Sequence, residues 1–168
     1  YEKFINLIPP NKKIGIVLRC RHIEKRYLEA KKLLKLCKKK KFTFLVSSSY
    51  IIAKSIGADG VHYPNKYNYC KKDPKILTTC SYHGYNDIKR IKQLSVGLVF
   101  ISPIFSTKSD INKKETGLIR ISFLANYLKY QYSVLGGVKS NNIKSLRNRG
   151  IKSISGLDII FDVIGVKC

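Results

Sequence analysis

Short apolar runs and amphipathic segments alternate along this sequence. Seven runs predict strands, because continuous apolar stretches of this length are typical of strands buried on both faces of a parallel sheet. They cover residues 14–18, 42–46, 60–62, 76–80, 97–101, 133–135 and 151–157.

Apolar residues at helical spacing lie between several of these runs. The stripes are Tyr27, Ala30, Leu33, Leu34 and Cys37, then Ile88, Ile91 and Leu94, then Leu124, Tyr127 and Leu128. A further helix with Ile143 and Leu146 on its apolar face is expected to be capped by Ser140 and to end near Gly150. The alternation predicts an α/β protein with a parallel sheet, either open and doubly wound or closed as a (β/α) barrel.

The length of 168 residues and the absence of repeats or linkers predict one domain, residues 1–168. No run of about 18 apolar residues is present, so we expect no membrane span, and residues 1–13 do not resemble a signal peptide. Five cysteines without metal-ligand spacing are typical of a reduced, cytoplasmic protein. His62 is expected to be buried and His22 exposed.

The formal net charge of +23 has two interpretations. A basic surface is typical of nucleic-acid binding. However, the lysines are scattered over nearly every segment, and Lys, Ile, Asn and Tyr are all abundant, as an A/T-rich coding sequence would produce. We favour compositional bias over a nucleic-acid partner, although the charge would also attract a phosphorylated ligand.

Polar residues and glycines follow the predicted strands, where parallel α/β folds build their sites. They are Arg19 and Arg21, Ser47, Ser48 and Ser49, Ser81 and His83, Thr107 and Lys108, Gly136 and Gly137, and Gly156 within the last run. Hydroxyls, a lysine and glycine amides that converge on one face suit phosphate. The sequence therefore predicts a phosphate-binding site.

Five segments, in one order along the chain, resemble the thiamin phosphate synthase family, which includes the thiazole tautomerases of the TenI group. "VLRCR" resembles Q-L-R-x-K, "SIGADGVHYPN" resembles GADGVHLGQ, "SYHG" resembles S-x-H-S, "ISPIFSTKS" resembles G-P-[IV]-F-P-T-x-T-K, and "VLGGVKSNN" resembles A-I-G-G-I-x-x-x-N. The resemblance implies a (β/α)8 TIM barrel. It also implies the synthase reaction, which joins hydroxymethylpyrimidine diphosphate to thiazole phosphate and releases pyrophosphate with the help of Mg²⁺.

The sequence departs from the family at the positions that serve Mg²⁺ and pyrophosphate. The family's N-D-R segment is replaced by Ser47–Ser49, its second acidic ligand falls at Tyr67, and its pyrophosphate lysine falls on Asp110. Mg²⁺ is thus a cofactor by resemblance alone, since the expected carboxylates are absent, and we assign no metal ligand. The tautomerase histidine falls at Pro103.

The resemblance implies roles for the residues that remain. Arg19 is a candidate catalytic residue, as is Lys108, which would replace the lost lysine. His83 is a third candidate, although we favour a structural role for it in the turn. The candidate phosphate-binding residues are Ser81, Thr107, Ser109, Gly136, Gly137 and Gly156, and the candidate substrate-pocket residues are Arg21, Ser47, Ser48 and Tyr82.

The N-terminal segment is shorter than the family's first βα unit. Two prolines in "NLIPPNKK" argue against a helix there, so either residues 4–8 form a short first strand or the barrel is incomplete. An incomplete barrel exposes apolar edges, which a homodimer would cover.

Three functions therefore stay open. The first is a divergent synthase of thiamin biosynthesis. The second is a non-catalytic relative, a pseudo-enzyme or TenI-like protein, that binds thiazole phosphate or thiamin phosphate. The third, ranked last, is a basic protein associated with nucleic acid.

Overall fold

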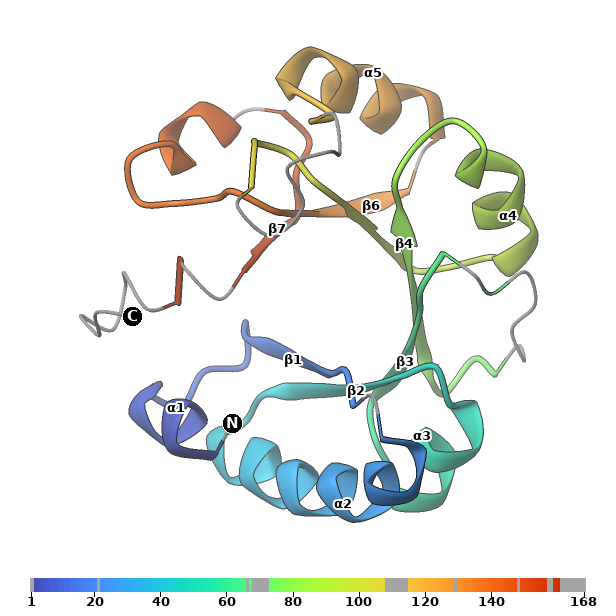
Figure 1. The fold of residues 1–168 in the computed structure, drawn as a ribbon, viewed down its shortest axis with the longest axis vertical. Coiled ribbons are helices and arrows are strands. Elements are labelled where there is room, and N and C mark those ends of the chain that lie inside the picture. Colours follow the sequence, from blue (N-terminus) through green and yellow to red (C-terminus); the bar gives the residue numbers. More distant parts are fainter. Residues whose placement is uncertain are drawn as a thin grey trace. The chain divides into compact units, whose positions relative to one another are not determined.

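The structure is a computed structural model, and it describes residues 2–20, 22–65, 67, 73–107, 115–128, 130–147, 149–156 and 159–160. The chain divides into two compact units, Tyr1–Thr79 and Cys80–Cys168. In both units strands and helices alternate along the chain, which confirms the predicted α/β class (Figure 1). Among the helices in this described part of the chain, none combines the length and the apolar character needed to cross a membrane.

The first unit contains three parallel strands that neighbour one another in chain order. Its elements are α1 (Glu2–Leu7), β1 (Gly15–Leu18), α2 (Ile23–Lys40), β2 (Thr43–Ser47), α3 (Tyr50–Ile56) and β3 (Gly60–Tyr63). Leu18 of β1 lies opposite Val46 of β2, and Val46 lies opposite Val61 of β3. Helices α2 and α3 lie side by side and contact β2 (Figure 1).

Helix α2 packs through the stripe that its spacing predicts. Ala30, Leu33, Leu34 and Cys37 are buried, and only Tyr27, at the start of the predicted stripe, is 41% exposed. Burial raises the pKa of the Cys37 thiol to about 11, because an apolar environment disfavours the thiolate.

The GADG segment has a structural role at the start of β3. The Asp59 carboxylate accepts a hydrogen bond from the Phe44 N–H at 2.8 Å, and the Asp59 N–H donates to the Phe44 carbonyl at 3.0 Å. A Cβ on Gly60 would lie 2.5 Å from the Leu77 carbonyl oxygen. Only glycine therefore permits this close approach of backbones.

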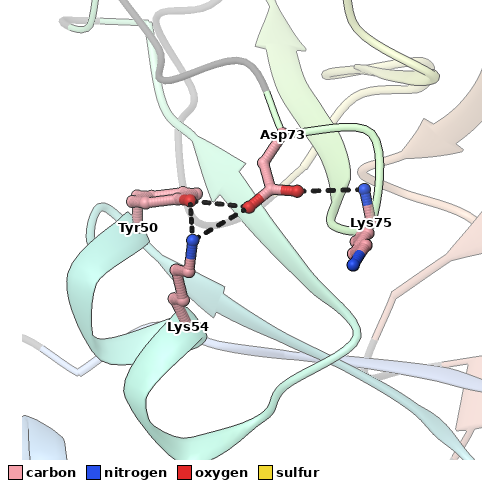
Figure 2. Close-up of polar contacts among 4 residues, drawn as sticks. All are labelled: Tyr50, Lys54, Asp73 and Lys75. Carbon is pink, nitrogen blue, oxygen red and sulfur yellow. Dashed lines mark hydrogen bonds and ion pairs between the residues drawn. The ribbon is translucent and has the colours of Figure 1, made fainter.

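A polar network joins α3 to the segment that precedes β4 (Figure 2). The Tyr50 hydroxyl donates to Asp73 Oδ2 at 2.7 Å, and Lys54 Nζ lies 3.4 Å from the same oxygen. The Lys75 N–H donates to Asp73 Oδ1 at 3.0 Å. These donors stabilise the carboxylate, the Tyr50 hydroxyl most strongly, and lower the pKa of Asp73.

The second unit contains the end of β4 and three further strands in chain order. Its elements are β4 (Leu77–Tyr82), which begins in the first unit, α4 (Asp87–Leu94), β5 (Leu98–Ile101), α5 (Leu118–Leu128), β6 (Gln131–Leu135), the 3₁₀ helix η1 (Ile143–Leu146) and β7 (Ser153–Ser155). Strands β5, β6 and β7 are parallel, with Ile101 opposite Val134 and Val134 opposite Ile154. Val99, Ile101 and Val134 are fully buried, as continuous apolar runs predict.

The N-terminal segment differs from the sequence-based prediction. Residues 2–7 form helix α1 instead of a short strand. The prolines follow the helix and end it without preventing it, and Lys40 Nζ donates to the carbonyl oxygens of Asn6 and Ile8 at its C-terminus. Ile5 packs inward.

Two other elements of the second unit also differ from prediction. Residues 143–146 form a 3₁₀ helix whose N-cap is Asn142, not Ser140, and the last strand spans only residues 153–155. On α5, Leu124 is buried as expected, whereas Tyr127 is 58% exposed and stacks on Phe123 with 5.8 Å between ring centroids. The other end predicted for the last strand, Leu157, lies outside the described residues.

Candidate phosphate-binding site

The turn after β6 packs tightly against the loop after β5. Gly136 and Gly137 have φ angles of 94° and 68°, which favour glycine. A Cβ on Gly137 would lie 2.6 Å from the Ser106 carbonyl oxygen and 2.8 Å from Phe105 Cβ, and one on Gly136 would lie 3.0 Å from Pro103. Both positions therefore require glycine, because their φ angles are positive and because a Cβ would come too close to the loop after β5.

Backbone hydrogen bonds join the same two segments. The Ile104 N–H donates to the Leu135 carbonyl at 3.0 Å, and the Phe105 N–H donates to the Gly136 carbonyl at 3.1 Å. Among the described residues, the N–H groups of Gly136 and Gly137 have no hydrogen-bond acceptor. Successive amides in such a turn form a concave donor surface that suits an oxyanion.

Thr107 lies beside this turn, with its methyl group 3.3 Å from the position of a Cβ on Gly136. The structure therefore brings together three of the predicted phosphate-binding residues, Thr107, Gly136 and Gly137. Lys108 and Ser109, predicted for the same loop, lie outside the described residues.

Asn142 holds the glycine turn from the other side. Its Nδ2 donates to the Gly137 carbonyl at 2.8 Å, and its Oδ1 accepts from the Lys139 N–H at 2.9 Å. This residue was not among the predicted site residues, although it is the last residue of the "VLGGVKSNN" segment. The asparagine in that pattern was thus a signal for the turn geometry.

A carboxylate lies next to the loop after β5. Glu115 Oε2 accepts a hydrogen bond from the Ser106 N–H at 2.9 Å, and the Thr116 N–H donates to the Pro103 carbonyl at 2.8 Å. Glu115 ties the end of the loop to its beginning, but its charge opposes an anion bound there. No local pattern in the sequence indicates this contact.

The turn after β4 is held by side chains of α4. The His83 N–H donates to Asp87 Oδ2 at 2.7 Å, and His83 Nδ1 lies 2.9 Å from the Ser102 carbonyl oxygen. Arg90 donates to Asp87 Oδ1 at 3.1 Å and to the Ser81 carbonyl. Both predicted residues of this turn, Ser81 and His83, are therefore fixed by neighbouring groups.

Tyr82 is 1% exposed, and its hydroxyl has no hydrogen-bond partner among the described residues. Burial, with a smaller effect of Tyr85, raises its pKa. The ring is buried, so the geometry gives it a structural role, and its place in a substrate pocket stays a prediction.

Gly156 follows β7, next to a polar pair formed by the hydroxyls of Ser133 and Ser155 at 2.6 Å. In the first unit, Arg19 is exposed at the end of β1. Ser47 is buried at the end of β2, with its hydroxyl 3.3 Å from that of Ser48. Arg21 lies outside the described residues.

The first unit also contains the positions at which the resemblance implies Mg²⁺ ligands. Ser48 has a φ of 67°, and its N–H donates to the His62 carbonyl at 2.8 Å. The Tyr67 hydroxyl donates to the Ser48 carbonyl at 3.3 Å, and Ser49 caps α3 by accepting from the Ile52 N–H. None of these side chains is a carboxylate, and Tyr67 and Ser48 are hydrogen-bonded to each other.

Mg²⁺ prefers oxygen ligands that include one or two carboxylates. The described residues contain no group of three or more His, Cys, Asp or Glu side chains that would hold a metal ion. Ser48 and Tyr67 supply no carboxylate at the implied positions, so these residues do not fit Mg²⁺. The two expectations for histidines hold: His62 is buried and bonded to Thr79 at 3.0 Å, and His22 is exposed.

Comparison with known sequences identifies thiamine-phosphate synthases among the relatives of this chain. Residues 13–160 match the thiamine monophosphate synthase family. The chain is 30% identical to a thiamine-phosphate synthase of Prochlorococcus marinus over 138 residues, which are 76% of this chain and 38% of that protein. It is 26% identical to a protein of Aquifex aeolicus named putative thiamine-phosphate synthase 2, covering 81% of this chain and 75% of that protein. The chain thus spans about two fifths of the length of two Prochlorococcus marinus relatives.

Comparison with solved structures gives the fold. A thiamine phosphate pyrophosphorylase from Pyrococcus furiosus superimposes with a TM-score of 0.73 over 97% of this chain and 85% of that chain, at 14% identity. The α/β fold is therefore of the TIM-barrel type, as predicted. The match to residues 13–160 covers nearly the whole sequence, and the chain belongs to the thiamine monophosphate synthase family.

Proposed function

We propose that this chain binds the phosphate group of thiazole phosphate or thiamin phosphate on the loops that follow β5 and β6. The observation that carries the proposal is the Gly136–Gly137 turn, whose two N–H groups lack an acceptor among the described residues. The turn is held in shape by Phe105, Ser106 and Asn142. A donor surface that is fixed before binding loses little conformational entropy when it takes up an anion.

Each group has a distinct part in this proposal. The amides of Gly136 and Gly137 donate hydrogen bonds to phosphate oxygens, and the Thr107 hydroxyl adds a donor from the neighbouring loop. Lys108 and Ser109 would complete the set, as the sequence predicts. The net charge of +23 attracts the phosphorylated ligand at long range.

Formation of thiamin phosphate from hydroxymethylpyrimidine diphosphate and thiazole phosphate is the second candidate function. Membership of the synthase family favours it. The neutral pair of Ser48 and Tyr67 favours the alternative, a relative that binds the phosphorylated ligand without catalysis. We propose no step through Mg²⁺ at these positions, because no carboxylate is present there.

Calorimetric titration tests the binding proposal. Thiamin phosphate is titrated into the chain, with thiamin, which lacks the phosphate, as the matched ligand. We expect thiamin phosphate to bind at least tenfold more tightly than thiamin, because the amides and hydroxyls contact the phosphate alone. Equal affinities, or no heat with either ligand, would contradict the proposal.

A product assay separates the two candidate functions. The two synthase substrates are incubated with the chain in Mg²⁺ and in EDTA, and thiamin phosphate is quantified. Product that depends on Mg²⁺ would support catalysis. It would contradict our interpretation that the positions of Ser48 and Tyr67 do not fit Mg²⁺. Binding of thiamin phosphate without product in either buffer is the result expected for a non-catalytic relative.

A further inference from the structure

A buried ion pair lies behind the turn that follows β4. Arg90 is 5% exposed, and its guanidinium is 3.0 Å from Asp87, one helical turn earlier on α4. Both side chains are largely shielded from solvent, with 6% and 15% of their surface exposed. Buried ion pairs contribute little net stability, because removing two charges from water is costly. Net stability alone therefore does not account for this pair.

The pair connects two points of one turn. Arg90 uses Nε to bind Asp87 Oδ1 at 3.1 Å and donates a second hydrogen bond to the Ser81 carbonyl. The other carboxylate oxygen, Asp87 Oδ2, accepts from the His83 N–H at 2.7 Å. The backbone on either side of Tyr82 is thus held by two side chains that are themselves paired.

The orientation of the His83 ring follows from this arrangement. Its Nδ1 lies 2.9 Å from the Ser102 carbonyl oxygen, which only accepts hydrogen bonds. Nδ1 therefore carries the proton, and in the neutral ring Nε2 is the acceptor. The Ser102 N–H donates to the Tyr82 carbonyl at 3.1 Å, so the loop after β5 is fixed to the same turn.

We propose that Arg90 and Asp87 are positioning residues that fix His83 with Nδ1 protonated, so that Nε2 is left to accept a hydrogen bond from a donor group of the ligand outside its phosphate. The ligand part of this inference rests on the proposed function. The protonated nitrogen of the ring is a property of the free protein and is tested without any ligand.

The first test is the ¹⁵N spectrum of the histidine rings at a pH where they are neutral. The chain has three histidines, and the variant His83→Asn identifies the signals of His83. We expect the Nδ1–H tautomer in the wild-type chain and a mixture of tautomers in Arg90→Met, which removes the guanidinium but keeps an unbranched apolar stem. Arg149→Met is the matched control, since Arg149 bonds Ser145 and Ser122 and not this turn.

Two milder variants keep the test decisive where Arg90→Met is too unstable to purify. Asp87→Asn retains an acceptor for the His83 N–H but removes the ion pair, and Arg90→Lys retains the charge but not the two-point contact. Both are expected to show a smaller shift toward the mixture. The Nε2–H tautomer in the wild type, or an unchanged tautomer in all three variants, would overturn the positioning role.

The second test is the affinity for thiamin phosphate. Arg90→Met and His83→Asn are each expected to weaken binding about tenfold, and the double variant to be no weaker than either, because Arg90 acts through His83. Additive losses would overturn this route. If thiamin phosphate does not bind the wild-type chain, the proposed function fails, while the spectra still decide whether Arg90 and Asp87 position the ring.

Discussion

Replacing Gly137 with alanine tests how the glycine turn is built, and the chain offers a matched control. Gly57 has a φ of 69° against 68° for Gly137, so both positions have a left-handed φ that disfavours alanine. A Cβ on Gly57 has no heavy atom within 4 Å, whereas one on Gly137 lies 2.6 Å from the Ser106 carbonyl oxygen. The two substitutions therefore differ mainly in the clash.

The magnitudes follow from these contacts. The left-handed conformation costs an alanine about 1–2 kcal/mol, which is the whole effect expected for Gly57→Ala. Overpacking against a backbone oxygen adds roughly 1–3 kcal/mol, so Gly137→Ala is expected to lose about 2–5 kcal/mol. The atoms that must move are backbone or near it, namely Ser106 O, Phe105 O and Phe105 Cβ, which makes relaxation difficult.

Urea unfolding followed by circular dichroism measures the free energy of unfolding of both variants. Titration with thiamin phosphate then compares their affinities under conditions where both are folded. We expect Gly137→Ala to bind at least tenfold more weakly, since the shifted turn no longer presents its two amides, and Gly57→Ala to bind as the wild type does. Equal stability loss in the two variants, or unchanged affinity in Gly137→Ala, would refute the reasoning.

Three further predictions concern single charged or ionisable groups. Glu115→Gln keeps an acceptor for the Ser106 N–H but removes a negative charge beside the site, so thiamin phosphate should bind about two- to fivefold more tightly at low salt and show a smaller gain at high salt, by calorimetry. No gain at low salt would contradict a phosphate at this loop. Because the folded chain lowers the pKa of Asp73, this carboxylate stabilises the fold above its unfolded pKa of about 3.9. That stabilisation is lost as the pH falls through the folded pKa. The difference in unfolding free energy between the wild type and Asp73→Asn should therefore shrink below about pH 4 and stay constant near neutrality, and the opposite trend would be inconsistent with Figure 2. The pKa of Cys37, about 11, predicts that iodoacetamide at pH 8 modifies Cys20 much faster than Cys37, as mass spectrometry of peptides would show. Equal rates would mean that the helix α2 is not packed as described.

The sequence predicts most of the strands because their signal is local. A continuous apolar run such as residues 97–101 predicts a buried strand without any information on distant contacts. The observed strand β5 begins one residue later than predicted. Consecutive glycines after a buried strand also predict a turn, because glycine adopts positive φ angles at little cost. The turn at Gly136 and Gly137 was found in this way.

The features that the sequence does not reveal depend on contacts between distant residues. Glu115 meets Ser106 across nine positions, and His83 meets Ser102 across nineteen, with no periodicity to mark either pair. Arg90 reads as one more cation on a very basic chain, yet it is buried against Asp87. Ser140 was preferred as a cap on propensity, whereas Asn142 occupies the N-cap of the 3₁₀ helix and bonds the glycine turn.

The amide resonances of Gly136 and Gly137 test the central claim most directly. Thiamin phosphate is added to ¹⁵N-labelled chain, and thiamin is added to a second sample. The account predicts that both amide protons move downfield to saturation with thiamin phosphate and stay in place with thiamin, because each would donate a hydrogen bond to phosphate. Unmoved glycine amides at saturating thiamin phosphate would contradict a phosphate site at the β5 and β6 loops.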